Sequence, residues 1–176
     1  MSHITTFTKK HFDPTAPEME LICIEDIAHA LSMLTRAGGH FNTFYSVAQH
    51  SINCMLEAKA KGCSDKVQLA CLLHDASEAY LSDITRPVKA VLDKYLEIEG
   101  NMQITIYTKW LLSPLTEDEL RQISEVDDTL LYYEFRHFMG EELFDCPPTL
   151  SLKPDFDFAD FPIIENSFLR MFNRFF

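Results

Sequence analysis

The chain has 176 residues, of which 47% are hydrophobic and 24% are charged, as expected for a globular protein with one sizeable core. Its formal net charge of −12 argues against binding to a nucleic-acid polymer or to an anionic membrane, since both require a basic surface. A small anionic substrate is compatible with this charge, provided that its pocket is locally positive or holds a metal ion.

Five scattered cysteines include no CxxC pair, so we expect reduced, buried thiols rather than a disulfide framework or a zinc finger. The first residues, MSHITTFTKKHF, are polar and do not resemble a signal peptide. No apolar run approaches the roughly 18 residues that cross a bilayer. The sequence therefore predicts a cytoplasmic protein.

Helical periodicity dominates the first half of the chain. The segment IEDIAHALSMLTR, from residue 24, carries an apolar stripe, and we expect its helix to end at Gly38 and Gly39. A second helix is expected after Ser46, with His50 and Cys54 on one side, until Gly62. A third is expected from Ser64 or Asp65, and its inward stripe comprises Val67, Ala70, Cys71, His74 and Glu78.

The second half is also predicted to be helical. Pro87 suits the first turn of a long helix that runs to Trp110, with Gly100 as a weak point. Its expected inward stripe is Val88, Val91, Leu92, Tyr95, Met102 and Ile106. Thr116 and Glu119 form a capping box for a fifth helix, with Leu120, Ile123, Asp127, Leu130 and Glu134 inward. A proline-bearing loop precedes a last short helix that holds Ile164, Phe168 and Phe172. With no convincing strand pair, we predict an all-α fold in a single compact domain over 1–176.

The stretch LLHDASEAY, residues 72–80, places His74, Asp75 and Glu78 in an otherwise apolar run. A buried carboxylate needs a counter-charge, hydrogen bonds or a metal ion. On one continuous helix, Glu78 follows His74 by four residues and Asp75 by three, so the three would share one side.

Two further polar side chains, His50 in SVAQHS and Asp127 in SEVDDTLLYYE, lie on apolar helix faces. Together with His74 and Asp75 they would make a mixed nitrogen and oxygen site for one Mn, Fe, Co, Ni or Zn ion, with room for water. A buried histidine can equally be a satisfied core residue, and the spacing alone leaves both interpretations open.

The pattern H…HD…D on a helical scaffold resembles the HD-domain metal-dependent phosphohydrolases. It is most similar to the 5'-deoxynucleotidases of the YfbR type and their phage relatives that hydrolyse deoxynucleoside triphosphates. The matching segments are RAGGHFNTFYSVAQHS, LLHDASEAYLSDITRPVK and the stretch around EVDDTLLYYE, which together span about 24–140. The string HDASE followed by D-x-x-x-P-V-K is the specific part of this resemblance.

The resemblance implies that His50, His74, Asp75 and Asp127 bind one divalent ion, with Mg added to the metals above. Asp128 is the rival of Asp127, which is preferred because family members place a glutamate seven residues after the ligand, here Glu134.

The resemblance also implies roles beyond the metal. Glu78, with the metal-bound Asp75, would act in catalysis. Arg36 would hold phosphate, Asp83 would contact the sugar 3'-hydroxyl, and Lys89 lies in the matching substrate-binding segment; His40 could touch phosphate or brace its loop. Alternatively, Glu78 could merely orient a ligand histidine, and Asp83 could only cap the turn before Pro87.

One position departs from this branch of the family. The residue after the arginine is usually a large aromatic, and here it is Ala37. A stacking surface for the base could be lost or be supplied by Phe41, Phe44 or Tyr45.

The implied function is release of phosphate from deoxynucleoside 5'-monophosphates by attack of a metal-activated water. A triphosphohydrolase acting on deoxynucleoside triphosphates is the alternative within the same chemistry. A non-catalytic HD module that binds a nucleotide is the alternative from another class. The expected partners are a small nucleotide and further copies of the chain in a homodimer or higher oligomer.

Overall fold

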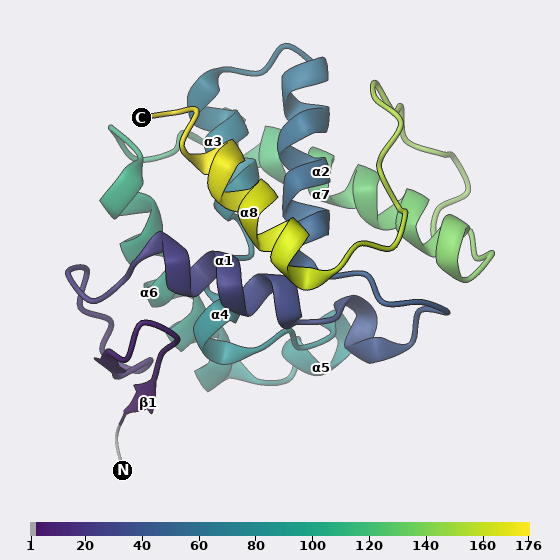
Figure 1. Cartoon of the computed structure of the whole chain (residues 1–176). Helices are drawn as coiled ribbons and strands as arrows, with labels where there is room; N and C mark the ends of the chain where they lie inside the picture. The colour runs from purple at the N-terminus through teal and green to yellow at the C-terminus, as the bar shows by residue number, and fades with distance from the viewer. Residues whose placement is uncertain (1–2) are drawn as a thin grey trace.

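The computed structural model describes residues 3–176 as a helical bundle with a small N-terminal hairpin (Figure 1). The helices are α1 (Ile24–Met33), the 3-10 helix η1 (Arg36–Gly39), α2 (Val47–Ala60), α3 (Asp65–Leu73), α4 (Glu78–Leu81), α5 (Arg86–Lys89), α6 (Asp93–Trp110), α7 (Glu117–Phe138) and α8 (Phe161–Phe172). This architecture confirms the predicted helical fold in outline.

The hairpin is a feature that the sequence did not predict. Strands β1 (Ile4–Thr5) and β2 (His11–Phe12) pair antiparallel, with Ile4 opposite Phe12. Two residues per strand are too few for an alternating pattern to be visible. Phe12 is fully buried, and its ring packs against Tyr80 at a centroid distance of 4.4 Å.

Helices α2 and α7 begin as predicted, because their caps are local in sequence. Ser46 accepts a hydrogen bond from the Gln49 N–H, and the Gln49 side chain accepts from the Ser46 N–H. Thr116 and Glu119 form the same reciprocal capping box at the start of α7.

Helix α1 ends earlier than predicted. Its C-cap is Leu34, whose backbone is extended, rather than Gly38 or Gly39. Both glycines belong to η1 and have positive φ angles, a left-handed backbone conformation that glycine adopts without steric cost. The chain around this turn is held by hydrogen bonds from Arg36 N to Tyr45 O and from Val47 N to Leu34 O, which fixes the start of the Arg36 side chain.

Two predicted helices are each broken in two. Helix α3 ends at Leu73, His74 is its C-cap, and the chain turns before α4 begins at Glu78. The predicted placement of His74 and Glu78 one turn apart on a continuous helix is therefore wrong. The long helix from Pro87 to Trp110 is likewise divided into α5 and α6, while Gly100 does not interrupt α6.

Some predicted inward positions lie at the surface. Val88, Val91, Leu92 and Leu120 are exposed, whereas Met102, Ile106, Ile123 and Leu130 are buried as predicted. Val88 lies on the short α5, Val91 and Leu92 lie in the connection between α5 and α6, and Leu120 lies in the first turn of α7.

The main core is formed where α2 packs against α3, α7 and α8, and where α1 packs along α8 (Figure 1). On α2, buried polar side chains at four-residue spacing hold the loop that follows α7. Gln49 donates to Asp157 O, Asn53 donates to Asp155 O, and Glu57 accepts from the N–H groups of Ser151 and Leu152. Within residues 3–176, no helix combines the length and the apolar character needed to cross a membrane.

Candidate metal centre and substrate pocket

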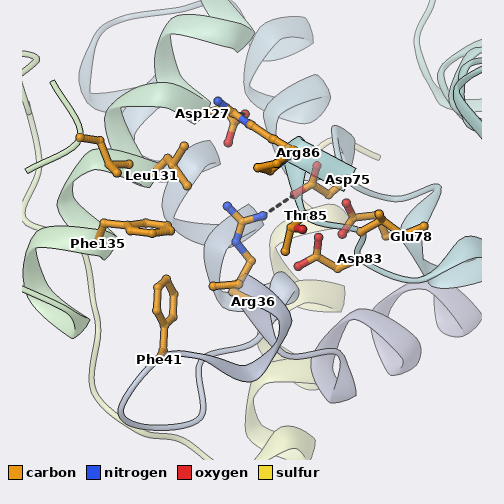
Figure 2. A pocket seen from close by; sticks show the side chains of 14 residues that line it. Arg36, Phe41, Asp75, Glu78, Asp83, Thr85, Arg86, Asp127, Leu131 and Phe135 are labelled. Atoms are coloured by element: carbon orange, nitrogen blue, oxygen red, sulfur yellow. Dashed lines mark hydrogen bonds and ion pairs between the residues drawn. The ribbon is translucent and has the colours of Figure 1, made fainter. Parts of the chain in front are cut away.

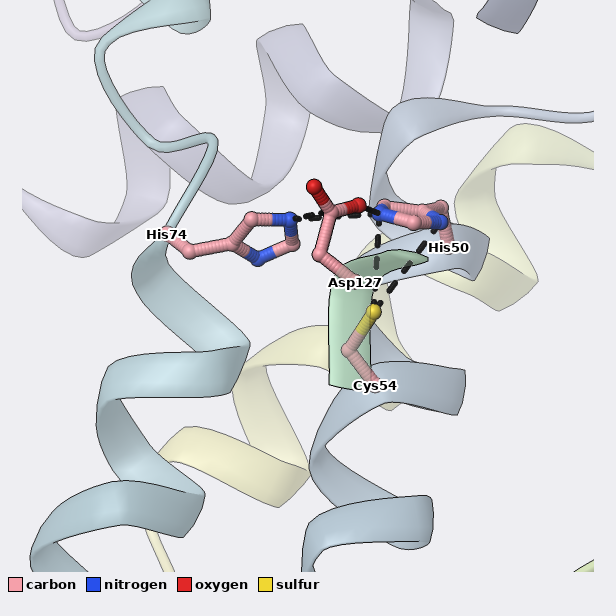
Figure 3. A group of neighbouring side chains, drawn as sticks. All are labelled: His50, Cys54, His74 and Asp127. Atoms are coloured by element: carbon pink, nitrogen blue, oxygen red, sulfur yellow. Dashed lines mark hydrogen bonds and ion pairs between the residues drawn. The ribbon is translucent and has the colours of Figure 1, made fainter. Parts of the chain in front are cut away.

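Three helical segments bring the four predicted metal ligands together. The Nε2 atoms of His50 and His74 lie 3.2 Å apart, and Asp127 Oδ1 lies 3.1 Å from the first and 3.7 Å from the second (Figure 3). Asp75 Oδ2 lies 3.3 Å from His74 Nε2 and 3.8 Å from His50 Nε2. The four donor atoms therefore surround one point.

The second nitrogen of each imidazole is already occupied. His50 Nδ1 lies 2.6 Å from the buried carboxylate of Glu134, and His74 Nδ1 lies 2.7 Å from the Cys71 carbonyl oxygen. Both partners accept hydrogen bonds, so each Nδ1 carries the proton. Each neutral ring then presents an Nε2 lone pair, and two lone pairs that face each other need a cation or a proton between them.

The spacing of the donors fits a transition ion. With metal–ligand bonds of about 2.1 Å, neighbouring ligands would be about 3.0 Å apart in an octahedron and about 3.4 Å apart in a tetrahedron. The distances between the two Nε2 atoms, and from them to the carboxylate oxygens of Asp75 and Asp127, run from 3.1 to 3.8 Å. The arrangement therefore needs little change to hold one ion.

The electrostatics of the cluster also favour a positive charge. Burial opposes the charged form of both imidazoles, but the acids around them raise their pKa values; for His74 these are Asp75 and Asp127. Burial likewise opposes the charged form of Asp127, yet hydrogen bonds from His50 and His74, whose Nε2 atoms are protonated when no metal is bound, hold its pKa well below the usual range. A divalent ion can supply this positive charge in place of protons.

Cys54 is a further donor that sequence reasoning missed. Its Sγ lies 3.4 Å from His50 Nε2, and His50, Cys54, His74 and Asp127 form a group that could hold a metal ion, with donor atoms within 4.8 Å of one another (Figure 3). Burial raises the pKa of this thiol to about 11. The available signal was its position four residues after His50, on the same face of α2.

Asp127 and Asp128 have different environments, which separates the two rivals. Both aspartates pair with Arg86, but among the described residues only Asp127 also pairs with the imidazoles, through Oδ1. The structure thus places Asp127, and not Asp128, among the donors.

Arg36 connects the cluster to the pocket. Its guanidinium lies 3.3 Å from Asp75 Oδ2 and 3.4 Å from Glu134 Oε2, and little of the side chain is exposed. Glu134 consequently contacts both His50 and Arg36. This buried carboxylate orients a candidate ligand and a candidate phosphate-binding group at once.

The carboxylate donors Asp75 and Asp127 line a cavity of about 350 Å³, a size typical of small-molecule sites, whereas His50 and His74 lie behind them and do not line it (Figure 2). One end is acidic and contains Asp75, Glu78, Asp83 and Asp127, while the other is apolar and contains Phe41, Leu131 and Phe135 (Figure 2). Arg36 lies between them, as Figure 2 shows. The rings of Phe41 and Phe135 meet edge to face at 5.4 Å.

Of the three aromatics considered as replacements beside Ala37, only Phe41 lines this cavity. Tyr45 is fully buried behind it, and Phe44 lines a separate cavity near Phe158. His40 is exposed and does not line the cavity, which gives no support to its predicted phosphate contact.

Glu78 lies at the acidic end as the first residue of α4. Its Oε1 lies 3.6 Å from Lys89 Nζ, while its buried Oε2 has no hydrogen-bond partner among the described residues. Burial, together with Asp75 and Asp83, raises the pKa of Glu78 to about 9, although Lys89 opposes the shift. Lys89 itself binds Glu99 at 2.7 Å behind Glu78 and does not line the cavity.

This raised pKa predicts a stability penalty that Glu78→Gln removes. Between pH 4.5 and about 9 the unfolded chain loses the Glu78 proton but the folded chain keeps it, so rising pH destabilises the metal-free wild type. The glutamine is neutral in both states. We expect urea unfolding in the presence of a chelator to give Glu78→Gln a higher free energy of unfolding than wild type. This difference should grow by roughly 1–3 kcal/mol from pH 5.5 to 8.5. A difference in the free energy of unfolding that is equal at both pH values would contradict the raised pKa of Glu78.

The chain is similar in sequence to two known proteins, and both are described as uncharacterized. No protein-family model matches the chain. It is 38% identical over 115 residues to the uncharacterized protein YfdR of Escherichia coli K12, covering 65% of this chain and 62% of YfdR. It is 35% identical over 123 residues to an uncharacterized protein of Rhodobacter capsulatus, covering 67% of this chain and 61% of that relative. The chain therefore spans about three fifths of the length of these curated relatives.

Proposed function

We propose that the protein is a metal-dependent phosphohydrolase of the HD-domain class that releases phosphate from deoxynucleoside 5'-monophosphates. The observation that carries this proposal is the convergence of two imidazole Nε2 atoms on two carboxylates, Asp75 and Asp127, which line a cavity together with Arg36. The resemblance of the HDASE and D-x-x-x-P-V-K segments to that class points to the same chemistry.

His50, His74, Asp75 and Asp127 would hold the divalent ion, which when bound lowers the pKa of water and neutralises charge on the phosphoryl group. Cys54 is an additional candidate donor. Arg36 can direct its remaining N–H groups at phosphate oxygens, since Asp75 and Glu134 already fix the plane of its guanidinium.

Hydrolysis adds water across the phosphorus–oxygen bond, so the attacking oxygen loses a proton and the leaving 5'-oxygen gains one. Glu78 suits the second task, because its carboxyl group lines the cavity and its burial favours the protonated form, which raises its pKa in the metal-free protein. Its unpartnered, buried Oε2 marks a place where that proton can be held.

The apolar end of the cavity suits the base. Phe41 and Phe135 provide aromatic surface in place of the large side chain that Ala37 lacks. Asp83, at the other end, would accept a hydrogen bond from the sugar. A deoxynucleotide would then lie across the cavity, with its phosphate near Arg36.

The proposal is tested by measuring product release from a panel of deoxy- and ribonucleotides with the metal-stripped protein and added Mn, Co, Ni, Zn or Mg. We expect inorganic phosphate from deoxynucleoside monophosphates, only in the presence of metal. Release of triphosphate from deoxynucleoside triphosphates would identify the alternative substrate class. Binding of nucleotides without any turnover would leave only the non-catalytic module.

Asp83→Ala is expected to weaken transition-state binding by about 1.5–3 kcal/mol, as for other hydrogen bonds to charged groups. Asp83 lines the acidic end of the cavity, and burial raises its pKa. A 3'-deoxy substrate should cost the wild type a similar amount in kcat/KM, and should cost the variant little more. If the 3'-deoxy substrate costs the variant as much in kcat/KM as it costs the wild type, Asp83 does not bind the 3'-hydroxyl and is only a cap of the turn before Pro87.

A further inference from the structure

We infer that Arg86 is a positioning residue of the candidate metal centre, which holds Asp127 so that a single carboxylate oxygen faces the two imidazoles. The inference rests on the proposed function for the presence of the metal. It assigns roles to two residues, Arg86 and Asp128, that neither the spacing of the motif nor the implied mechanism uses.

The geometry divides the two oxygens of Asp127 between two partners. Oδ1 lies 3.1 Å from His50 Nε2, and Oδ2 lies 2.7 Å from Arg86 Nη2. Figure 2 shows the guanidinium of Arg86 beside Asp127 at one side of the cavity. With Oδ2 engaged in this charge-assisted hydrogen bond, only Oδ1 is directed at the cluster.

Asp128 completes the arrangement from the next position on α7. Its Oδ1 accepts from Arg86 Nη1 at 2.8 Å, so the two prongs of the guanidinium are shared between consecutive carboxylates. A planar fork held at both prongs has a fixed orientation, which a single contact does not give. The pair of acids therefore has two functions, one residue binding the metal and the other holding the arginine.

The contribution of Arg86 lies in orientation rather than in the strength of an ion pair. Its side chain is 59% exposed, and exposed ion pairs add little to folding stability. An outer partner that fixes a ligand nevertheless affects metal affinity, typically 10–100-fold when it is removed. Without Arg86, Asp127 could rotate, and its Oδ2 would lose the positive partner that offsets the repulsion between Asp127 and Asp75.

A rival role for Arg86 is direct binding of substrate phosphate, because it also lines the cavity. The two roles differ in a measurable way. A positioning residue changes metal affinity when no phosphate is present, whereas a phosphate-binding residue changes only KM.

The test uses the metal-stripped full chain, with Mn²⁺ or Co²⁺ as the probe in phosphate-free buffer. Calorimetric titration should show Arg86→Ala binding the ion about 10–100-fold more weakly than wild type. Arg86→Lys should recover part of the loss, and Asp128→Asn should show a smaller loss in the same direction. The Co²⁺ visible absorption of Arg86→Ala should also shift, while the melting temperature of its metal-free form stays near that of wild type.

Arg121→Ala is the matched control. Arg121 is also on the surface, 61% exposed, and pairs with two acids of α7, Asp118 and Glu125, at 3.1 and 2.9 Å. It should leave metal affinity and the Co²⁺ spectrum unchanged. An Arg86→Ala protein that binds the ion as Arg121→Ala does would overturn the inference and leave the proposed function intact. A wild type that binds neither ion would overturn both.

Discussion

Glu78→Gln is expected to retain the metal ion and the substrate but to lose roughly 10²–10⁴-fold in kcat, which is the usual contribution of a positioned acid or base. Glutamine preserves the shape of the side chain and its contact with Lys89, yet it cannot give a proton to the leaving oxygen. The four proposed ligands do not include Glu78, and none of the measured donor distances involves it. The loss should therefore appear in turnover and leave metal content unchanged.

Glu99→Gln is a suitable control for this experiment. Glu99 accepts from the same Lys89 at 2.7 Å but lies on the far side of it from the cavity. Its replacement should change kcat by no more than a few-fold. A Glu78→Gln protein without metal would make Glu78 a ligand or the support of one, and near-normal turnover would require another route for the proton.

The features that could be predicted from the sequence are those with local causes. The starts of α2 and α7 depend on caps that contact residues three positions away, and both were found as predicted. The same holds for the buried face of α8, where Ile164, Phe168 and Phe172 follow one helical stripe.

The break after α3 has a cause that no local pattern contains. Gln103, from α6, donates to the Leu73 carbonyl at 2.7 Å and accepts from the Ser77 N–H at 3.2 Å. This side chain satisfies backbone groups that a continuous helix would have paired internally. The break turns His74 toward His50 and places Glu78 at the start of a new helix.

The partners of the site are the part that the sequence could not supply. Residues of suitable chemistry were identified on α2, α3 and α7, but the hydrogen bonds that orient them come from distant positions. Glu134 reaches His50 across 84 positions of the chain, and Arg86 reaches Asp127 across 41. Such contacts depend on how the helices pack, whereas residue type and helical face are properties of the segments themselves.

His74→Ala and Asp75→Ala are each expected to abolish both metal uptake and hydrolysis. Each removes one of the four proposed donors, His74 Nε2 or Asp75 Oδ2, which lie 3.3 Å apart, and alanine offers no ligand atom in place of either. Elemental analysis of the purified proteins should show less than a tenth of the wild-type metal content. Thermal unfolding provides a second readout, since an ion held at 100 times its Kd stabilises the folded state by about 2.7 kcal/mol.

The consecutive residues Asp127 and Asp128 of α7 provide a matched pair of variants for the same metal-binding test. Asp127→Ala should lose the ion as completely as His74→Ala does, because Asp127 Oδ1 contacts both imidazoles. Asp128→Ala removes an equal charge from the adjacent position but leaves all four donors, so it should keep most of the metal and most of the metal-dependent gain in melting temperature. Normal metal content in His74→Ala and Asp75→Ala would contradict the assignment of these residues as ligands. Equal losses of metal from Asp127→Ala and Asp128→Ala would show that negative charge near the site, rather than the direction of Asp127 Oδ1, determines metal binding.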